Sequence, residues 1–227
     1  MSRHLRLETL TRIKELGLVP IFNTHDIVLA SSIVKACYDG GASVVEFTNR
    51  GDRAIDVFRQ LAIFRDTELP EMILGAGSIM DAPTAAMYIA AGADFIVSPV
   101  LDEQIAVLCN GRKIPFMPGC CTVTEIHKAH TLGVEFCKLF PGDCIGGAAF
   151  VKSVKGPMPW TQIIAMGGIA PTEESLGEWF DAGVACVGMS SKLFPKTLLE
   201  IGDFDQIRGI VRQTLEIISK VQENKGL

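Results

Sequence analysis

One lysine in an apolar stretch is the residue of this sequence best suited to covalent chemistry. Residues 134–142 read Val-Glu-Phe-Cys-Lys-Leu-Phe-Pro-Gly, which predicts a buried strand that stops at a Pro-Gly turn. Side chains alternate between the faces of a strand, so Lys138 shares a face with Phe136 and Phe140. Poor solvation there lowers the pKa of a lysine, and a neutral amine attacks carbonyl carbon. The alternative is a lysine at a strand end whose ammonium reaches back to water.

A glutamate on another predicted strand is the second candidate. In residues 43–48, Val45 and Phe47 suit a surface that faces helices, so Glu46 would point to the other side. An isolated buried carboxylate is costly, so Glu46 must be paired or take part in a reaction. Alternate strands of a closed barrel supply the same layer of side chains, which would place Glu46 and Lys138 across one cavity, each shifting the titration of the other. A structural ion pair is the alternative.

Glycine-rich turns near the end of the chain could hold an anion. Gly167 and Gly168 follow the seventh predicted strand, and Ser190 lies in the loop after the eighth. Glycines let the backbone N–H groups approach the oxygens of an anion, and a serine adds a donor. Tight turns also use paired glycines, and Glu173 and Glu174 lie close to the first loop. We therefore give the two loops equal weight.

The elements that must position these residues repeat one pattern: a short apolar run, a turn and a helical stretch. The apolar runs predict strands at 18–22, 43–48, 72–74, 94–97, 114–117, 134–142, 161–165 and 184–188. Helical patterns follow at 26–38, 52–64, 81–90, 102–110, from the capping box 122–125, at 146–154, at 172–180, and from Asp203 or Asp205. A short amphipathic segment, 7–16, precedes them all.

Eight strand–helix units with fully apolar strands predict a parallel sheet covered by helices, and eight strands close a TIM barrel. We expect an α/β fold in which 1–227 is a single (β/α)8 TIM-barrel domain, with 1–17 as a short N-terminal helical extension. A doubly wound sheet is the alternative, although it would usually have fewer units. The site of such a barrel lies at the carboxyl ends of the strands, which here carry Glu46, Thr48, Arg50, Ser78, Ser98, Pro99, Pro118, Lys138, Phe140, Gly167, Gly168, Ser190 and Ser191.

The composition excludes several classes of partner. The net charge of −5 comes without a basic stripe, so we expect no nucleic acid as partner. No apolar run reaches the roughly 18 residues that a membrane span needs, and the first residues contain no apolar signal segment. The seven cysteines suit reduced, buried thiols in a cytoplasmic protein. Cys120 and Cys121 with His127 and His130 match no zinc spacing, so we expect no metal site.

A set of motifs in a fixed order carries a resemblance that spans the chain from about Leu18 to Phe194. The motifs are Glu46-Phe47-Thr48-Asn49-Arg50, Gly75-Ala76-Gly77-Ser78, Ser98-Pro99, Pro118-Gly119, Phe136-Cys137-Lys138-Leu139-Phe140-Pro141 and Gly167-Gly168-Ile169. In this order they resemble the 2-keto-3-deoxy-6-phosphogluconate aldolase family, which also contains 4-hydroxy-2-oxoglutarate aldolases. The resemblance implies a homotrimeric class I aldolase that needs no metal or other cofactor and binds a keto acid substrate and pyruvate.

The same resemblance assigns roles to individual residues. Lys138 matches the Schiff-base lysine and Glu46 the general acid/base. The remaining matches are Arg50 and Ser78 for the pyruvate carboxylate, Pro99 and Phe140 for the pocket walls, and Gly167, Gly168 and Ser190 for the phosphate. The implied reaction cleaves a 2-keto-3-deoxy-6-phospho sugar acid to pyruvate and glyceraldehyde 3-phosphate, and extends to 4-hydroxy-2-oxoglutarate, which gives pyruvate and glyoxylate. The alternatives are an aldolase for the galactonate epimer, a phosphate-binding barrel epimerase or synthase, and a non-catalytic sugar-acid-binding barrel.

Three positions depart from the family pattern. Ser78 stands where the family usually has threonine, and Val100 follows Ser98-Pro99 where a glycine is common. Met166 stands before the glycine pair where the family often has threonine, so the hydroxyl that could hydrogen-bond to the hydroxyl groups of the substrate is missing. Relatives that act on the galactonate epimer also have an apolar residue there, so the preferred C4 epimer stays open.

Overall fold

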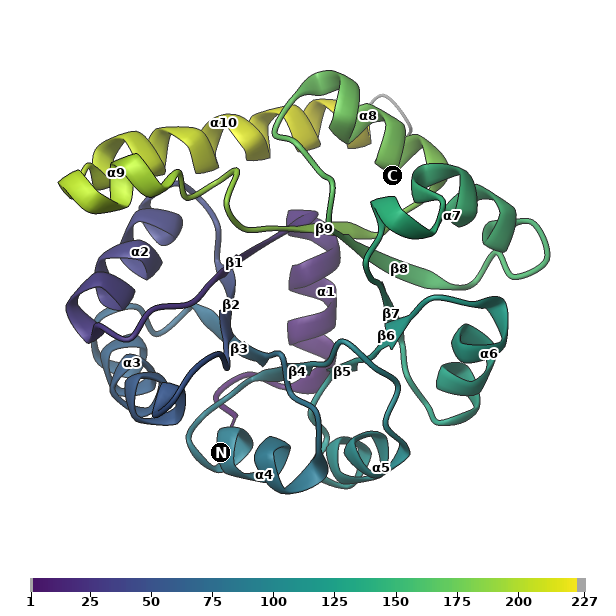
Figure 1. The fold of residues 1–227 in the computed structure, drawn as a ribbon, viewed down its shortest axis with the longest axis horizontal. Helices are drawn as coiled ribbons and strands as arrows, with labels where there is room; N and C mark the ends of the chain where they lie inside the picture. Colours follow the sequence, from purple (N-terminus) through teal and green to yellow (C-terminus); the bar gives the residue numbers. More distant parts are fainter. Residues whose placement is uncertain (1, 224–227) are drawn as a thin grey trace.

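The computed structural model describes residues 2–223 and shows a barrel of parallel strands surrounded by helices (Figure 1). The hydrogen-bonded order of the strands is β5-β4-β3-β2-β1-β9-β8-β7-β6, and every neighbouring pair is parallel. The strands are β1 Leu18–Phe22, β2 Val44–Thr48, β3 Ile73–Gly77, β4 Phe95–Val97, β5 Phe116–Met117, β6 Gly119–Cys120, β7 Phe136–Leu139, β8 Gln162–Met166 and β9 Cys186–Met189.

Two short strands, β5 and β6, together form the fifth strand of the barrel. Only Pro118 separates them, and a proline has no N–H to donate to a neighbouring strand. Its carbonyl still accepts a hydrogen bond from Lys138 N at 2.8 Å, so the barrel stays joined across the interruption. The predicted eight-stranded barrel is confirmed and the doubly wound sheet is excluded, although the fifth strand occupies 116–117 and 119–120 rather than 114–117.

Five of the helices begin where the sequence predicts a capping residue. The side chains of Asp26, Asp81, Asp102, Thr122 and Thr172 each accept a hydrogen bond from a backbone N–H in the first turn. The helices are α1 Arg6–Leu16, α2 Ile27–Asp39, α3 Ala54–Glu68, α4 Ala82–Ala90, α5 Glu103–Arg112, α6 Val123–Thr131, α7 Gly147–Lys155, α8 Glu173–Ala182, α9 Lys196–Ile201 and α10 Phe204–Glu223. The sequence did not predict α9 or the 3₁₀ turn Asp143–Ile145.

The first helix closes one end of the barrel. It ends at Gly17, immediately before β1, and therefore lies at the amino ends of the strands, where Figure 1 shows it across the barrel axis. Its side chains Leu10 and Ile13 pack with inward-facing residues such as Val44 and Phe95 in one apolar cluster. The segment predicted as an N-terminal extension thus fills the barrel floor. A second cluster, between the sheet and the outer helices, contains the outward-facing residues of the same strands.

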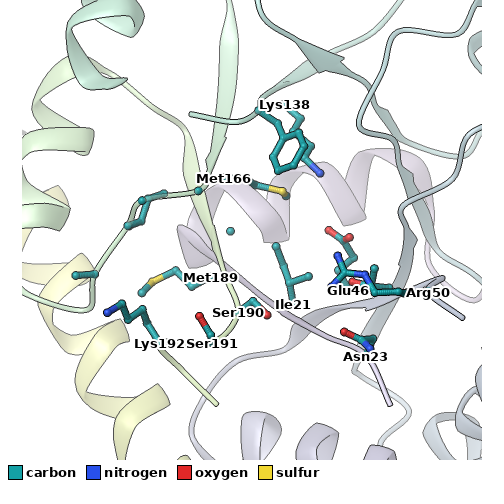
Figure 2. Close-up of a pocket in the computed structure, with 17 residues that line it drawn as sticks. Ile21, Asn23, Glu46, Arg50, Lys138, Met166, Met189, Ser190, Ser191 and Lys192 are labelled. Carbon is teal, nitrogen blue, oxygen red and sulfur yellow. The ribbon is translucent and has the colours of Figure 1, made fainter. Parts of the chain in front are cut away.

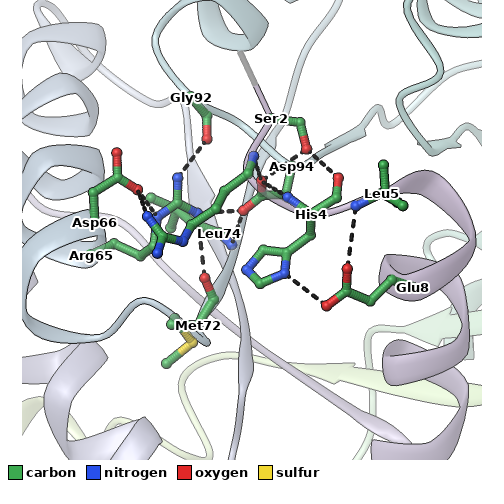
Figure 3. Close-up of polar contacts among 11 residues, drawn as sticks. Ser2, His4, Leu5, Glu8, Arg65, Asp66, Met72, Leu74, Gly92 and Asp94 are labelled. Atoms are coloured by element: carbon green, nitrogen blue, oxygen red, sulfur yellow. Dashed lines mark hydrogen bonds and ion pairs between the residues drawn. The ribbon is translucent and has the colours of Figure 1, made fainter.

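A buried ion pair fastens the start of the chain beneath the barrel (Figure 3). Arg65 of α3 pairs with Asp94, whose side chain is fully buried before β4. Asp94 also accepts hydrogen bonds from Leu74 N at 2.9 Å, Arg3 N at 2.8 Å and Ser2 Oγ at 3.0 Å. These hydrogen bonds satisfy the remaining lone pairs of Asp94, so its burial is tolerated. The bonds from Ser2 and Arg3 also hold the residues that precede α1 in place. Within residues 2–223, no helix combines the length and apolar character required to span a membrane.

Candidate active site

A cavity of about 500 Å³ opens at the carboxyl ends of the strands. Residues from β1, β2, β7, β8 and β9 and the loops that follow them line it. Seven of the predicted site residues belong to this lining: Glu46, Arg50, Lys138, Phe140, Gly167, Gly168 and Ser190. The barrel therefore brings most of the predicted set into one space.

Lys138 projects from β7 into the barrel. Its neighbours Cys137 and Leu139 pack in the outer cluster, whereas Phe136 packs inside, so the alternation expected for this strand is present. The residue is 5% exposed, and Nζ lies 4.5 Å from the centroid of the Phe140 ring. Burial lowers the pKa of Lys138, and the carboxylate of Glu46 opposes part of that shift. The amine is thus held in the environment that makes a lysine nucleophilic.

Glu46 enters the same space from β2. It is 2% exposed, and Oε2 has no hydrogen-bond partner among the described residues. Burial raises the pKa of Glu46, while the charge of Lys138 acts in the opposite direction. An unpartnered buried carboxyl oxygen is costly, and at this position it faces the cavity, where it can accept or donate a proton.

Lys138 and Glu46 face each other without touching (Figure 2). Within residues 2–223, Lys138 Nζ forms neither an ion pair nor a hydrogen bond, so the direct structural pair weighed above is not formed. Each charge nevertheless shifts the pKa of the other group across the gap: Lys138 lowers that of Glu46, and Glu46 raises that of Lys138. The gap can receive a carbonyl carbon on the side of the amine and a hydroxyl or water on the side of the carboxyl.

The remaining polar groups lie around the rim. Arg50, in the loop after β2, is exposed and lies on the Glu46 side in Figure 2. Gly167 and Gly168 follow β8 with φ of 103° and 71°, values that favour glycine. A Cβ at Gly168 would lie 2.5 Å from Cβ of Asp143, so the chain passes too closely there for any side chain.

Two predicted residues stand apart from the cavity. Ser78 follows β3 and Pro99 follows β4, and neither belongs to the lining. Ile79 N donates to Val97 O at 3.0 Å, so the chain after β3 turns towards β4. The Pro99 carbonyl packs against the backbone at Gly119, where a Cβ would lie 2.1 Å from the oxygen. Their assignment to the carboxylate site and the pocket wall stays a prediction.

Several lining residues were not singled out in the sequence. Ile21 and Asn23 belong to the end of β1 and could have been found by the rule that the site gathers at the carboxyl ends of strands. Met189 ends β9 and Lys192 lies in the loop that follows it, and neither carries a motif of its own. Residues 2–223 contain no group of three histidine, cysteine, aspartate or glutamate side chains that could hold a metal ion.

Comparison with known proteins supplies the family. The family model described as KDPG and KHG aldolase matches residues 10–210. A 2-dehydro-3-deoxy-phosphogluconate aldolase of Pseudoalteromonas atlantica is 33% identical over 198 residues, which is 87% of this chain and 89% of the relative. The KHG/KDPG aldolase of Escherichia coli is 32% identical over 199 residues, or 87% and 90% of the two chains.

A solved structure shows the same fold with a covalent intermediate in place. The KDPG aldolase of Legionella pneumophila, with pyruvate captured at low pH as a covalent carbinolamine intermediate, has a TM-score of 0.79 at 25% identity and covers 87% of this chain and 93% of its own. This chain belongs to the KDPG and KHG aldolase family, because the family model matches most of its length and the relatives are more than 30% identical to it.

Proposed function

We propose that this protein is a class I aldolase that cleaves a 2-keto-3-deoxy-6-phospho sugar acid to pyruvate and glyceraldehyde 3-phosphate through a Schiff base on Lys138. The observation that carries the proposal is the pair of buried groups, Lys138 and Glu46, which share one cavity at the catalytic face of the barrel without neutralising each other. The relatives named as aldolases for this substrate support it.

The reaction begins with the neutral amine of Lys138. It attacks the C2 ketone, and the resulting carbinolamine loses its hydroxyl as water to give an iminium. Glu46, through a water molecule, supplies the proton that this step needs. The iminium then accepts the electron pair of the C3–C4 bond when Glu46 takes the proton of the C4 hydroxyl.

Cleavage releases an aldehyde and leaves an enamine of pyruvate on Lys138. Protonation of C3 restores the iminium, and hydrolysis frees pyruvate and the amine. Arg50 offers a guanidinium to the carboxylate of the substrate, which would fix C2 against the amine. No step calls for a metal, so we propose that turnover persists in the presence of a chelator.

Reductive trapping tests the nucleophile. Borohydride added with pyruvate should attach a reduced pyruvyl group to Lys138, and peptide mass spectrometry locates it. Lys138→Arg should abolish both trapping and turnover, whereas the control Lys155→Arg, at the end of α7, should keep both. A label on Lys152 or Lys155, or no label on the wild-type protein, would overturn the assignment.

One observation favours a second substrate of the same class. Met166 is buried in the cavity wall and offers no hydroxyl to the substrate, which suits the galactonate epimer. A panel of keto-deoxy acids that includes both C4 epimers and 4-hydroxy-2-oxoglutarate distinguishes these aldolase activities by the rate of pyruvate release. A barrel epimerase or synthase, or a barrel that only binds sugar acids, would release no pyruvate from any of them.

The organisation of the protein completes the proposal. The seven cysteines are unpaired thiols, which fits the reducing cytoplasm that we infer for it. We further propose that 1–227 acts as one catalytic domain and assembles as a homotrimer. Sedimentation of the purified protein measures the oligomeric state, and a monomer at working concentration would contradict the trimer.

A further inference from the structure

Asn49 and Arg50 lie where the chain leaves β2, and their side chains leave it in opposite directions. Along the strand the side chains alternate, so Thr48 lines the cavity whereas Phe47 packs in the outer cluster. The alternation continues past the end of the strand: Arg50 lines the cavity, and Asn49 reaches the outer layer, where it meets Tyr88 of α4. One peptide unit therefore joins a side chain in the cavity to a contact between the sheet and the outer helices.

The ring of Tyr88 is packed firmly in that outer layer. It is 1% exposed, and it meets the ring of Phe58 of α3 edge-on, with 4.9 Å between the centroids and an angle of 67°. Phe58 in turn packs against Phe47 of β2, with 5.9 Å between the centroids. Tyr88 is thus fixed against the strand and the helix that flank the loop of Arg50. Burial raises the pKa of Tyr88 to about 12, so its hydroxyl keeps the proton that it donates.

Two hydrogen bonds hold Asn49. The Tyr88 hydroxyl donates to Oδ1 of Asn49 at 2.9 Å, and the backbone N–H of Asn49 donates to the carbonyl of Gly77 at the end of β3. A buried tyrosine hydroxyl needs a partner, and within residues 2–223 Asn49 is the one that the Tyr88 hydroxyl has. Breaking this bond is therefore costly, and the residue that precedes Arg50 is fixed on both its backbone and its side chain.

The rest of this loop has few anchors of its own. Within residues 2–223, the side chains of Arg50, Asp52 and Arg53 form no hydrogen bond and no ion pair, and α3 begins after Arg53 without a side-chain cap. The ring of His25 packs on Gly51, where a Cβ would lie 2.5 Å from Cε1, but this contact involves no hydrogen bond. The direction in which Arg50 leaves the chain is therefore set mainly by the residue before it.

We propose that Tyr88 is a positioning residue: its hydrogen bond to Asn49 fixes the backbone from which Arg50 reaches the carboxylate of the keto acid. A guanidinium binds a carboxylate best in one geometry, so a loop that moves loses part of that affinity. This inference rests on the proposed function and deepens it, because it makes a side chain outside the cavity responsible for part of the carboxylate binding. Tyr88 does not line the cavity and takes no part in proton transfer.

The test compares a ketone that has a carboxylate with one that has none. Tyr88→Phe removes the hydroxyl and keeps the packed ring. The pyruvate concentration that half-saturates borohydride trapping should rise roughly fivefold, the effect of losing one neutral hydrogen bond. The half-saturating concentration of pyruvamide, which is uncharged, should stay the same, whereas a general disturbance of the fold would affect both ketones. In the cleavage direction, KM for the keto acid should rise by the same factor while kcat stays nearly unchanged.

Further variants check that the effect passes through Asn49 and Arg50. Asn49→Ala, which removes the acceptor and keeps the tyrosine, should reproduce the result of Tyr88→Phe. Arg50→Ala should raise the half-saturating pyruvate concentration about tenfold or more, and adding Tyr88→Phe to it should cause no further rise. The matched control is Tyr38→Phe. Tyr38 is half-buried on α2, and within residues 2–223 its hydroxyl forms no hydrogen bond, so this variant should behave like the wild type.

These readouts distinguish failure of the inference from failure of the proposed function. If wild-type protein is not trapped by pyruvate, the Schiff-base function fails. If the wild type is trapped but Tyr88→Phe changes the half-saturation equally for both ketones, or for neither, the role of Tyr88 is overturned while the aldolase function stands. The same holds if the effect persists in the Arg50→Ala background. Should Tyr88→Phe not fold, Asn49→Ala decides the question by the same comparison of the two ketones.

Discussion

Replacing Gly77 with alanine should displace the Glu46 carboxyl group while leaving the barrel intact. Gly77 ends β3 beside Thr48 of β2. A Cβ built there would lie 1.9 Å from Oε1 and 2.7 Å from Cδ of Glu46. The backbone of Gly77 is outside the left-handed region, so alanine can adopt it. The new Cβ would also lie 3.2 Å from Cβ of Val97, a tight contact that a shift of a few tenths of an ångström relieves, so the main conflict is with the side chain proposed as the acid/base.

The size of the effect follows from the overlap. Carbon and oxygen atoms normally approach no closer than about 3.3 Å, so Oε1 must move by more than 1 Å, roughly the misplacement that can cost 10²-fold in rate. We expect kcat of Gly77→Ala to fall by about 10²-fold, with a melting temperature close to that of the wild type.

A double-mutant cycle in pyruvate release is the assay. Because the loss acts through Glu46, adding Gly77→Ala to Glu46→Gln should cost little more than Glu46→Gln alone. Gly75→Ala is the control on the same face of β3, since its Cβ would meet the ring of buried Phe95 at 2.1 Å. That overpacking should destabilise the fold by about 1–3 kcal/mol and spare the activity of folded molecules.

Two results would refute this reasoning. Wild-type kcat in Gly77→Ala would mean that the position of the Glu46 carboxyl is unimportant. A full 10²-fold further loss in the Glu46→Gln background would mean that the alanine acts on something other than Glu46.

Two further predictions concern the pair and the cavity wall. Glu46→Gln should lower turnover by roughly 10²–10⁴-fold. It should also move the acidic limb of the pH profile of pyruvate trapping to lower pH. Burial lowers the pKa of Lys138, and the Glu46 carboxylate that raises this pKa would be gone, so the amine would stay neutral at lower pH. Trapping yield against pH measures it, and a limb that is unchanged or moves up would contradict the coupling. Met166→Thr should raise the ratio of kcat/KM for the gluconate epimer to kcat/KM for the galactonate epimer by about tenfold, because the threonine hydroxyl can form a new hydrogen bond. An unchanged ratio would show that the residue at position 166 does not distinguish the configuration at C4.

The sequence predicts the features of this protein that depend on local patterns. Asp26 and Thr122 begin helices because a capping side chain satisfies the backbone nearest to it, and Lys138 faces inward because strands alternate. Alternation ends where the strand ends, which is why Ser78 and Pro99 could not be placed by counting from β3 and β4. Lys192 has no periodic pattern around it, and its place at the rim depends on Leu193 and Phe194 being buried, which the local sequence does not specify.

The floor that α1 forms under the barrel has a kinetic consequence for the proposed reaction. In the part of the chain that the structure describes, α1 fills the end of the barrel at the amino ends of the strands. Substrate and products therefore pass through the opening at the carboxyl ends. Lys138 lies deep, at 5% exposure, whereas Lys192 lies at the exposed rim. The aldehyde therefore stands between pyruvate and the solvent, so it departs first in cleavage, and pyruvate enters first in synthesis.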